Sequence, residues 1–163
     1  MKKISLLRHA KSDWDAPYGG DHERPLNKRG KNAARLMGEE LNRLNFNPDY
    51  ILCSTAVRTK ETLSIIAECA GWTSPIHFRT ALYLCSTEDV RKEIVQLPDS
   101  SESVLIVGHQ PTTGAFAHWL SDQVHVEVPT CTFLSFNVEI DLWPEISTNC
   151  AGLEVYLTPK SIS

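Results

Sequence analysis

Short apolar runs alternate along this chain with longer segments in which apolar residues recur at helical spacing. The runs at residues 3–7, 50–53 and 103–107 have the length and content of buried strands, and a predicted helix follows each of them. This alternation is typical of a parallel sheet with helices on both faces, because parallel neighbours need a crossover connection. We therefore expect an α/β fold with three layers, α/β/α, around a mostly parallel sheet.

The predicted helices have recognisable ends. Residues 28–44 carry apolar side chains at helical spacing, and Asn27 precedes them as a capping residue. A second helix is expected over residues 56–70, closed by Gly71. Ser86, with Asp89 three positions further on, has the pattern of an N-terminal cap for the next helix.

Further strands are predicted at residues 76–78, 133–139 and 153–158. No convincing helix separates the last two, so these can pair antiparallel. Pro111 is expected in the first turn of the helix that follows strand 103–107, where its missing N–H is tolerated.

Length and charge limit the possible classes of protein. A chain of 163 residues without repeats or a linker-like run is expected to form a single domain over residues 1–163. Its net charge of −4 argues against a general nucleic-acid binder, which needs a basic face. No segment approaches the roughly 20 apolar residues of a membrane span, so we expect no membrane partner.

The cysteines indicate a reducing environment. There are five, an odd number, and no pair has the Cys-x-x-Cys spacing. This pattern predicts neither a disulfide framework nor a zinc site, and favours the cytoplasm.

Basic groups are expected at equivalent ends of three predicted strands. Arg8 and His9 follow the first strand, Arg58 lies in the first turn of the helix after the second strand, and His109 follows strand 103–107. The carboxyl ends of strands in an open α/β sheet share one crevice, where ligands bind. Helix N-termini at such a crevice add N–H donors and the positive end of a dipole. The sequence therefore predicts a pocket for a dianionic phosphoryl group.

His9 is the candidate nucleophile of that pocket. A neutral imidazole can attack phosphorus near neutral pH, since its ordinary pKa is roughly 6.5 and no proton must first be removed. The phosphoryl group would then be held covalently as phosphohistidine. Arg8, Arg58 and His109 would stabilise charge on its equatorial oxygens. This chemistry requires neither a metal nor a cofactor.

These residues carry a family resemblance. The segments LRHA at residues 7–10 and GHQP at 108–111, with Arg58 shortly after Ser54, resemble the histidine phosphatase superfamily. The short chain, RHAKSDW at 8–14 and RPL at 24–26 are similar to the SixA-type phosphohistidine phosphatases.

The resemblance implies a phosphoglycerate mutase-like fold with His9 as nucleophile and Arg8, Arg58 and His109 as phosphate ligands. It makes Arg24 a further substrate contact, although Arg24 could equally form a structural salt bridge. The lid that covers small-molecule sites in other members is expected to be absent. The implied substrate is a phosphohistidine on a protein, such as a phosphotransfer domain, with a small phosphate ester as the alternative.

A general acid for the leaving group is not evident. The segment LYLCS at residues 82–86, where one would be sought, has no acid, which leaves Asp13 and Glu88 as candidates. Phosphohistidine has a good nitrogen leaving group and needs less acid assistance than an alkyl ester. The missing acid therefore favours a phosphoramidate substrate.

Three other functions fit the sequence less well. Cys85 and Arg91 have the Cys-x5-Arg spacing of a cysteine-dependent phosphatase, but the loop between them has no glycine and two carboxylates. A phosphate-binding regulatory module without turnover would not need both histidines. Phosphoglycerate mutase-like transfer is disfavoured by the short chain and the missing acid.

The tryptophans are expected to serve mainly in packing. Trp14 could instead line the entrance to the substrate site. The four are Trp14, Trp72, Trp119 and Trp143.

Overall fold

The computed structural model describes residues 1–15, 17 and 19–163, and its described strands form one six-stranded sheet. The strands are β1 (Lys2–Arg8), β2 (Tyr50–Ser54), β3 (Ile76–Arg79), β4 (Ser103–Gly108), β5 (Phe133–Val138) and β6 (Ala151–Leu157). Their order across the sheet is β3-β2-β4-β1-β5-β6. The four strands β3, β2, β4 and β1 are parallel, whereas β5 runs antiparallel to both β1 and β6.

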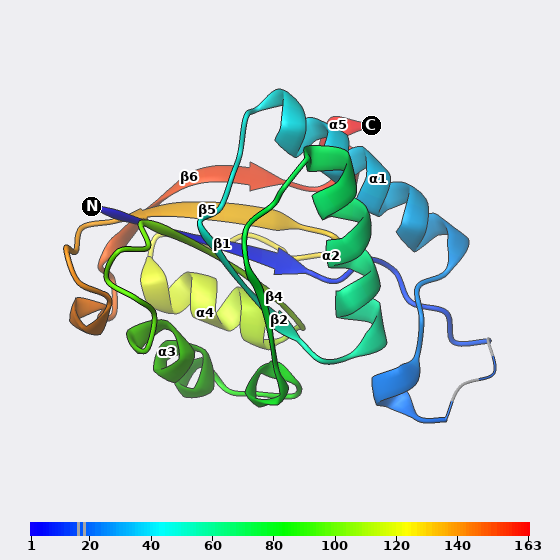
Figure 1. Ribbon diagram of the computed structural model, residues 1–163, viewed down its shortest axis with the longest axis horizontal. Coiled ribbons are helices and arrows are strands. Elements are labelled where there is room, and N and C mark those ends of the chain that lie inside the picture. The colour runs from blue at the N-terminus through cyan, green and yellow to red at the C-terminus, as the bar shows by residue number, and fades with distance from the viewer. Residues whose placement is uncertain (16, 18) are drawn as a thin grey trace.

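Helices cover both faces of this sheet (Figure 1). On one face α1 (Lys28–Arg43) packs against α2 (Val57–Ala70). On the other face lie α3 (Thr87–Val95) and α4 (Thr112–Leu120). The short α5 (Pro159–Ile162) contacts α1 near the end of the chain. The predicted three-layer α/β/α class is confirmed.

Alternating side chains of the central strands build two cores. Leu6 and Ile106 belong to the apolar cluster under α3 and α4, whereas Leu7 and Val107 belong to the cluster under α1 and α2. Burial of one such side chain contributes roughly 1.5–3 kcal/mol. The continuous apolar runs of β1 and β4 are thus explained, because both faces of these strands are buried.

The structure confirms most predicted helix ends. The Asn27 side chain accepts a hydrogen bond from Gly30 N at 2.8 Å, and Gly71 ends α2 with a φ of 72°. Ser86 and Asp89 form a capping box at α3. Pro111, expected in the first turn of α4, instead precedes the helix as its capping residue.

Leu44 is a second difference from the predicted elements. It was expected on the apolar face of α1, but the helix ends at Arg43 and Leu44 is exposed. The chain turns there, and Phe46 takes the inward place, with its ring 4.9 Å from that of Phe133. The apolar spacing continues past the last helical residue, so spacing alone could not locate this end.

Gly30 in the first turn of α1 allows a close approach between that helix and the loop after β1. A Cβ at this position would lie 2.1 Å from Lys11 O and 2.9 Å from Lys11 N. The loop is also tied to the helix start by a hydrogen bond from Asn27 N to Lys11 O at 3.0 Å. A side chain here would force the backbone apart.

We therefore expect Gly30→Ala to lower the free energy of unfolding by about 1–3 kcal/mol, the usual range for overpacking, despite the better helix propensity of alanine. Urea unfolding monitored by circular dichroism measures this change. Gly152→Ala is the matched control, because no heavy atom lies within 4 Å of its added Cβ. Equal stability of the two variants would show that the approach at Gly30 is not tight.

Candidate active site

The register of the parallel strands brings the predicted basic groups to one edge of the sheet. Arg8 pairs with Gly108 across β1 and β4, and Cys53 pairs with Val107 across β2 and β4. His9 N donates to Gly108 O at 3.1 Å. His9 and His109 are thus the next residues after the paired Arg8 and Gly108, and they lie side by side. Their ring centroids are 5.4 Å apart.

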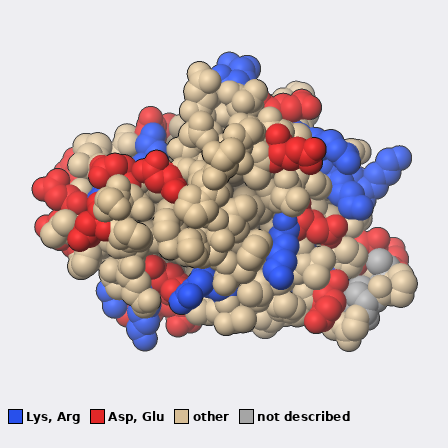
Figure 2. All heavy atoms as spheres, viewed as in Figure 1, with Lys and Arg blue, Asp and Glu red and all other residues tan. Residues whose placement is uncertain are grey.

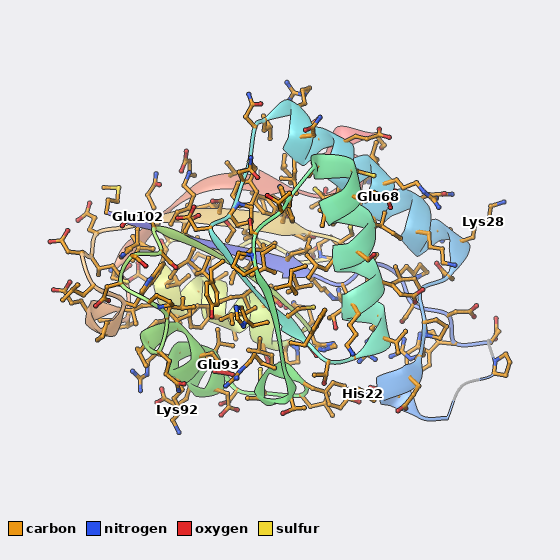
Figure 3. All side chains as sticks on the ribbon, viewed as in Figure 1. His22, Lys28, Glu68, Lys92, Glu93 and Glu102 are labelled. Carbon is orange, nitrogen blue, oxygen red and sulfur yellow. The ribbon has the colours of Figure 1, made fainter. Side chains whose placement is uncertain are left out.

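A cavity of about 330 Å³ opens at this edge. Its lining includes every residue predicted as a phosphate ligand or nucleophile. The lining residues are Arg8, His9, Lys11, Ser12, Trp14, Arg24, Arg58, Leu84, His109, Gln110 and Thr130. In Figure 3 the labelled His22 marks the neighbouring 3-10 turn η1 (Asp21–Glu23), which contacts α2.

His9 is buried, and its hydrogen bond determines which ring nitrogen can react. Nδ1 lies 2.7 Å from Ala10 O, and a carbonyl oxygen can only accept, so Nδ1 carries the proton. The lone pair is then on Nε2. Burial, reinforced by the charges of Arg58 and Arg8, lowers the pKa of His9 to about 4. The imidazole is therefore neutral and nucleophilic at physiological pH.

His109 is hydrogen-bonded through Nε2, whereas His9 is hydrogen-bonded through Nδ1. Its Nε2 lies 2.8 Å from Ser54 Oγ, and that hydroxyl in turn accepts from Ala56 N at 3.3 Å. The hydroxyl proton is then directed at Nε2, which favours the tautomer with the proton on Nδ1. Burial and the charge of Arg58 lower the pKa of His109 to about 3, so this ring also is neutral.

Buried donors without partners surround these histidines. Among the described residues, Arg8 Nε, Arg24 Nε, Arg58 Nε and His109 Nδ1 have no hydrogen-bond partner. An unpaired buried donor costs about 1–3 kcal/mol, so four of them in one place indicate a site that an anion completes. Forked guanidiniums and N–H groups match the oxygens of a phosphoryl group.

Asp21 organises the arginines and was not predicted from the sequence. Its carboxylate accepts from Arg24 Nη2 at 2.8 Å and from Arg58 Nη2 at 3.0 Å, and its backbone oxygen accepts from Arg58 Nη1 at 2.7 Å. Tyr83 donates to the same carboxylate at 2.6 Å. The Tyr83 hydroxyl and the arginines hold the pKa of Asp21 well below its usual range. The only sequence signal was the three-residue spacing between Asp21 and Arg24.

Arg24 combines the two roles that the sequence left open. It lines the cavity, pairs with Asp21 and donates to Ser12 Oγ. Trp14 also lies on the lining, 71% exposed, with its ring 3.6 Å from the Arg24 guanidinium carbon. Of the two roles that the sequence left open for Trp14, packing and the entrance, its exposed ring on the cavity lining favours the entrance.

The candidate acids lie away from the cavity lining. Asp13 Oδ1 accepts from Asp15 N at 2.9 Å, and exposed Glu88 pairs with Arg91 at 2.6 Å. None of the described lining residues is an aspartate or a glutamate. Asp21 stands behind the arginines, but its lowered pKa makes it a poor proton donor.

The rival cysteine mechanism lacks its geometry. Arg91 is held by Glu88 on α3 rather than over Cys85. Burial raises the pKa of the Cys85 thiol, which disfavours the reactive thiolate.

The described residues offer neither a metal cluster nor a membrane-spanning helix. No group of three or more histidine, cysteine, aspartate or glutamate side chains among the described residues could hold a metal ion. In the same part of the chain, no helix is long and apolar enough to cross a membrane.

Comparisons with known proteins found a matching family model and several relatives. A family model described as the histidine phosphatase superfamily (branch 1) matches residues 4–83. An uncharacterized protein of Mycobacterium tuberculosis is 32% identical over 165 residues, which cover 94% of this chain and 100% of the relative.

Solved structures extend the likeness to the whole chain. A candidate SixA phosphohistidine phosphatase from Nakamurella multipartitia has a TM-score of 0.84 and 26% identity, over 97% of this chain and 96% of that one. The protein histidine phosphatase SixA complexed with tungstate has a TM-score of 0.85 and 21% identity, over 99% of both chains.

Fold and site together define an α/β phosphatase. The chain belongs to the histidine phosphatase superfamily, and its fold is that of the phosphoglycerate mutase-like members.

The two buried histidines make stability depend on pH. Folding holds the pKa of His9 at about 4 and that of His109 at about 3, both below the ordinary 6.5. The unfolded chain therefore binds more protons over this interval, and the free energy of unfolding falls as the pH drops from 7 towards 4. At pH 5 we expect a loss of about 2 kcal/mol for each histidine.

Urea unfolding at pH 7 and pH 5 measures this loss. In the double variant His9→Gln, His109→Gln, amides that do not titrate replace both imidazoles. The loss in free energy of unfolding between pH 7 and pH 5 should therefore be smaller than in wild type by most of the amount expected for the two histidines. The same pH dependence in wild type and variant would mean that neither imidazole is held neutral by the fold.

Proposed function

We propose that this protein is a phosphohistidine phosphatase that acts on a phosphorylated protein through a covalent intermediate on His9. The observation that carries this proposal is the neutral, buried His9, with its lone pair on Nε2, inside a cavity lined by arginines and by no described carboxylate. Such a site supplies a nucleophile and anion stabilisation, but no evident acid.

In the first step, His9 Nε2 attacks phosphorus and the bond from phosphorus to the substrate's imidazole nitrogen breaks. Arg8, Arg24 and Arg58, with His109 Nδ1, stabilise charge on the equatorial oxygens through donors that are unpaired in the free protein. A substrate whose ring is already protonated leaves as neutral imidazole. The substrate thus brings the proton that an alkyl ester would require from a general acid.

In the second step, water attacks the phosphoryl group on His9. The bond between Nε2 and phosphorus breaks. His9 leaves as a neutral imidazole, because its proton stays on Nδ1 and is hydrogen-bonded to Ala10 O. Both protons of the water stay on the product, which is released as dihydrogen phosphate. Neither step needs a redox change or another reactant.

The entrance supports a protein substrate over a small ester. Trp14 and Leu84 line the cavity and are 71% and 72% exposed, so apolar side chains border its mouth. A phosphorylated side chain on a protein surface can enter such an open cavity. The names of the SixA neighbours describe phosphohistidine and protein histidine phosphatases, which supports the same substrate class. We also propose a cytoplasmic location, since the five cysteines are free thiols.

The decisive experiment compares phosphate release by wild type and His9→Ala from a phosphohistidine-bearing phosphotransfer domain and from an aryl phosphate. We expect the variant to lose roughly a thousandfold or more on both substrates, as for other covalent nucleophiles. His77→Ala on β3 is the matched control and should keep full activity, because it lies outside the cavity lining.

Two results would count against the proposal. Activity that persists in His9→Ala would remove His9 as the nucleophile. Hydrolysis of alkyl phosphates as efficient as that of phosphohistidine would contradict the substrate class, since the site offers alkyl leaving groups no evident acid.

Activity should not depend on a divalent metal, because guanidinium and imidazole groups already stabilise the phosphoryl oxygens. Phosphate release should be the same before and after exhaustive treatment with EDTA. A loss that added divalent cation restores would overturn this metal-free mechanism.

A further inference from the structure

The first turns of α1 carry positive charge without a compensating acid. Lys28, Arg29, Lys31 and Arg35 are exposed, and no aspartate or glutamate occurs over residues 24–38. Figure 2 shows lysine and arginine side chains gathered over this helix. The chain as a whole has a net charge of −4, so this concentration of cations runs against its overall composition.

Helix stability does not explain these cations. The N-terminus of a helix is the positive end of its dipole, where a cation is unfavourable by about 0.3–1 kcal/mol. α1 has no acidic residue in its first turn, whereas α3 has Glu88 and Asp89 there. A charge pattern that opposes local stability indicates a role in recognition.

These cations also lack the partners that others on the surface have. Arg43 pairs with Glu40, Arg91 with Glu88 and Lys3 with Glu154. Across residues 1–15, 17 and 19–163, no ion pair involves Lys28, Arg29, Lys31, Arg35 or Lys160. Their charges are therefore available to a partner.

A groove of about 750 Å³ lies beside this basic surface, and Arg29 and Lys160 are among its lining residues. Arg29 and Leu36 of α1 line one side, and Tyr156 and Lys160 line the other. Arg35 Nη1 donates to Asn32 on the same wall at 3.0 Å. Glu127 is the single acidic side chain among the described lining residues.

The groove and the active cavity share one described lining residue. Thr130 lines both, and the loop that carries it is held at the active site by the hydrogen bond from Arg8 Nη1 to Val128 O at 2.9 Å. A protein whose phosphorylated side chain enters the cavity would therefore lay its surrounding surface over this groove.

We propose that Lys28, Arg29, Lys31, Arg35 and Lys160 form a docking surface for an acidic face of the phosphorylated protein substrate. This inference rests on the phosphohistidine phosphatase function proposed above. Complementary charge at the docking surface steers the encounter and orients the substrate, which raises kcat/KM for acidic partners. The cavity then performs the same chemistry on any phosphohistidine delivered to it.

The test uses two phosphohistidine peptides of equal length, one with glutamates and one with lysines around the phosphorylated residue, and an aryl phosphate without flanking residues. Wild type should prefer the acidic peptide by about tenfold in kcat/KM, and the preference should weaken as salt screens the charges. Lys28→Glu, Lys31→Glu should abolish the preference while hydrolysis of the aryl phosphate is unchanged. Acidic residues at the start of α1 suit its dipole, so this variant is expected to fold.

Lys92→Glu is the matched control. Lys92 is an exposed lysine on α3, and Figure 3 shows it far from Lys28, at the opposite end of the molecule. It should keep the wild-type preference between peptides.

Several outcomes would overturn the docking surface. Equal kcat/KM for both peptides in wild type would do so, as would an equal loss of preference in Lys92→Glu. Binding to anionic vesicles or to RNA that Lys28→Glu, Lys31→Glu abolishes, without any peptide preference, would assign the surface to another class of partner. If wild type hydrolyses the aryl phosphate but neither peptide, the proposed function itself fails, and the docking surface with it.

Discussion

Burial of two arginines and partial burial of a third beside two imidazoles is the constraint on which the rest of this structure depends. Taking a charge out of water costs several kcal/mol unless it is paired and hydrogen-bonded. Arg24 and Arg58 are 5% and 3% exposed, and both rely on the carboxylate of Asp21. Arg8 relies on a backbone oxygen from the loop before β5. These partners accept hydrogen bonds from some of the N–H donors of each guanidinium. The remaining donors are left for a phosphoryl group.

The same concentration of charge prepares both histidines for their proposed roles. Positive neighbours and burial oppose protonation, so His9 keeps a lone pair and His109 remains a neutral donor. None of the described lining residues is a carboxylic acid that could assist a poor leaving group, and the carboxylate of nearby Asp21 is paired with arginines that help to keep its pKa low. The proposed nucleophile, anion site and substrate preference thus have one electrostatic origin.

Much of the fold was predictable because its signals are local. The capping box at Ser86, the αL residue Gly71 and the apolar run of β4 each depend on a few neighbouring residues, and all were predicted from them. Leu44 was misplaced, because an apolar side chain at the end of a helix can turn either way. Asp21 was missed because its importance arises from Arg58 and Tyr83, 37 and 62 positions further along the chain.

The sequence by itself determined the α/β class, the strand ends that carry Arg8, His9 and His109, and the position of Arg58 at the start of α2. These follow from periodicity and from the rule that parallel strands share one carboxyl edge. Only the tertiary structure decided which nitrogen of His9 is free, that Asp21 holds the arginines, and that an unpaired basic surface adjoins the cavity. Hydrogen-bond partners, burial and charge neighbours depend on side chains distant in sequence, and packing alone brings them within a few ångströms.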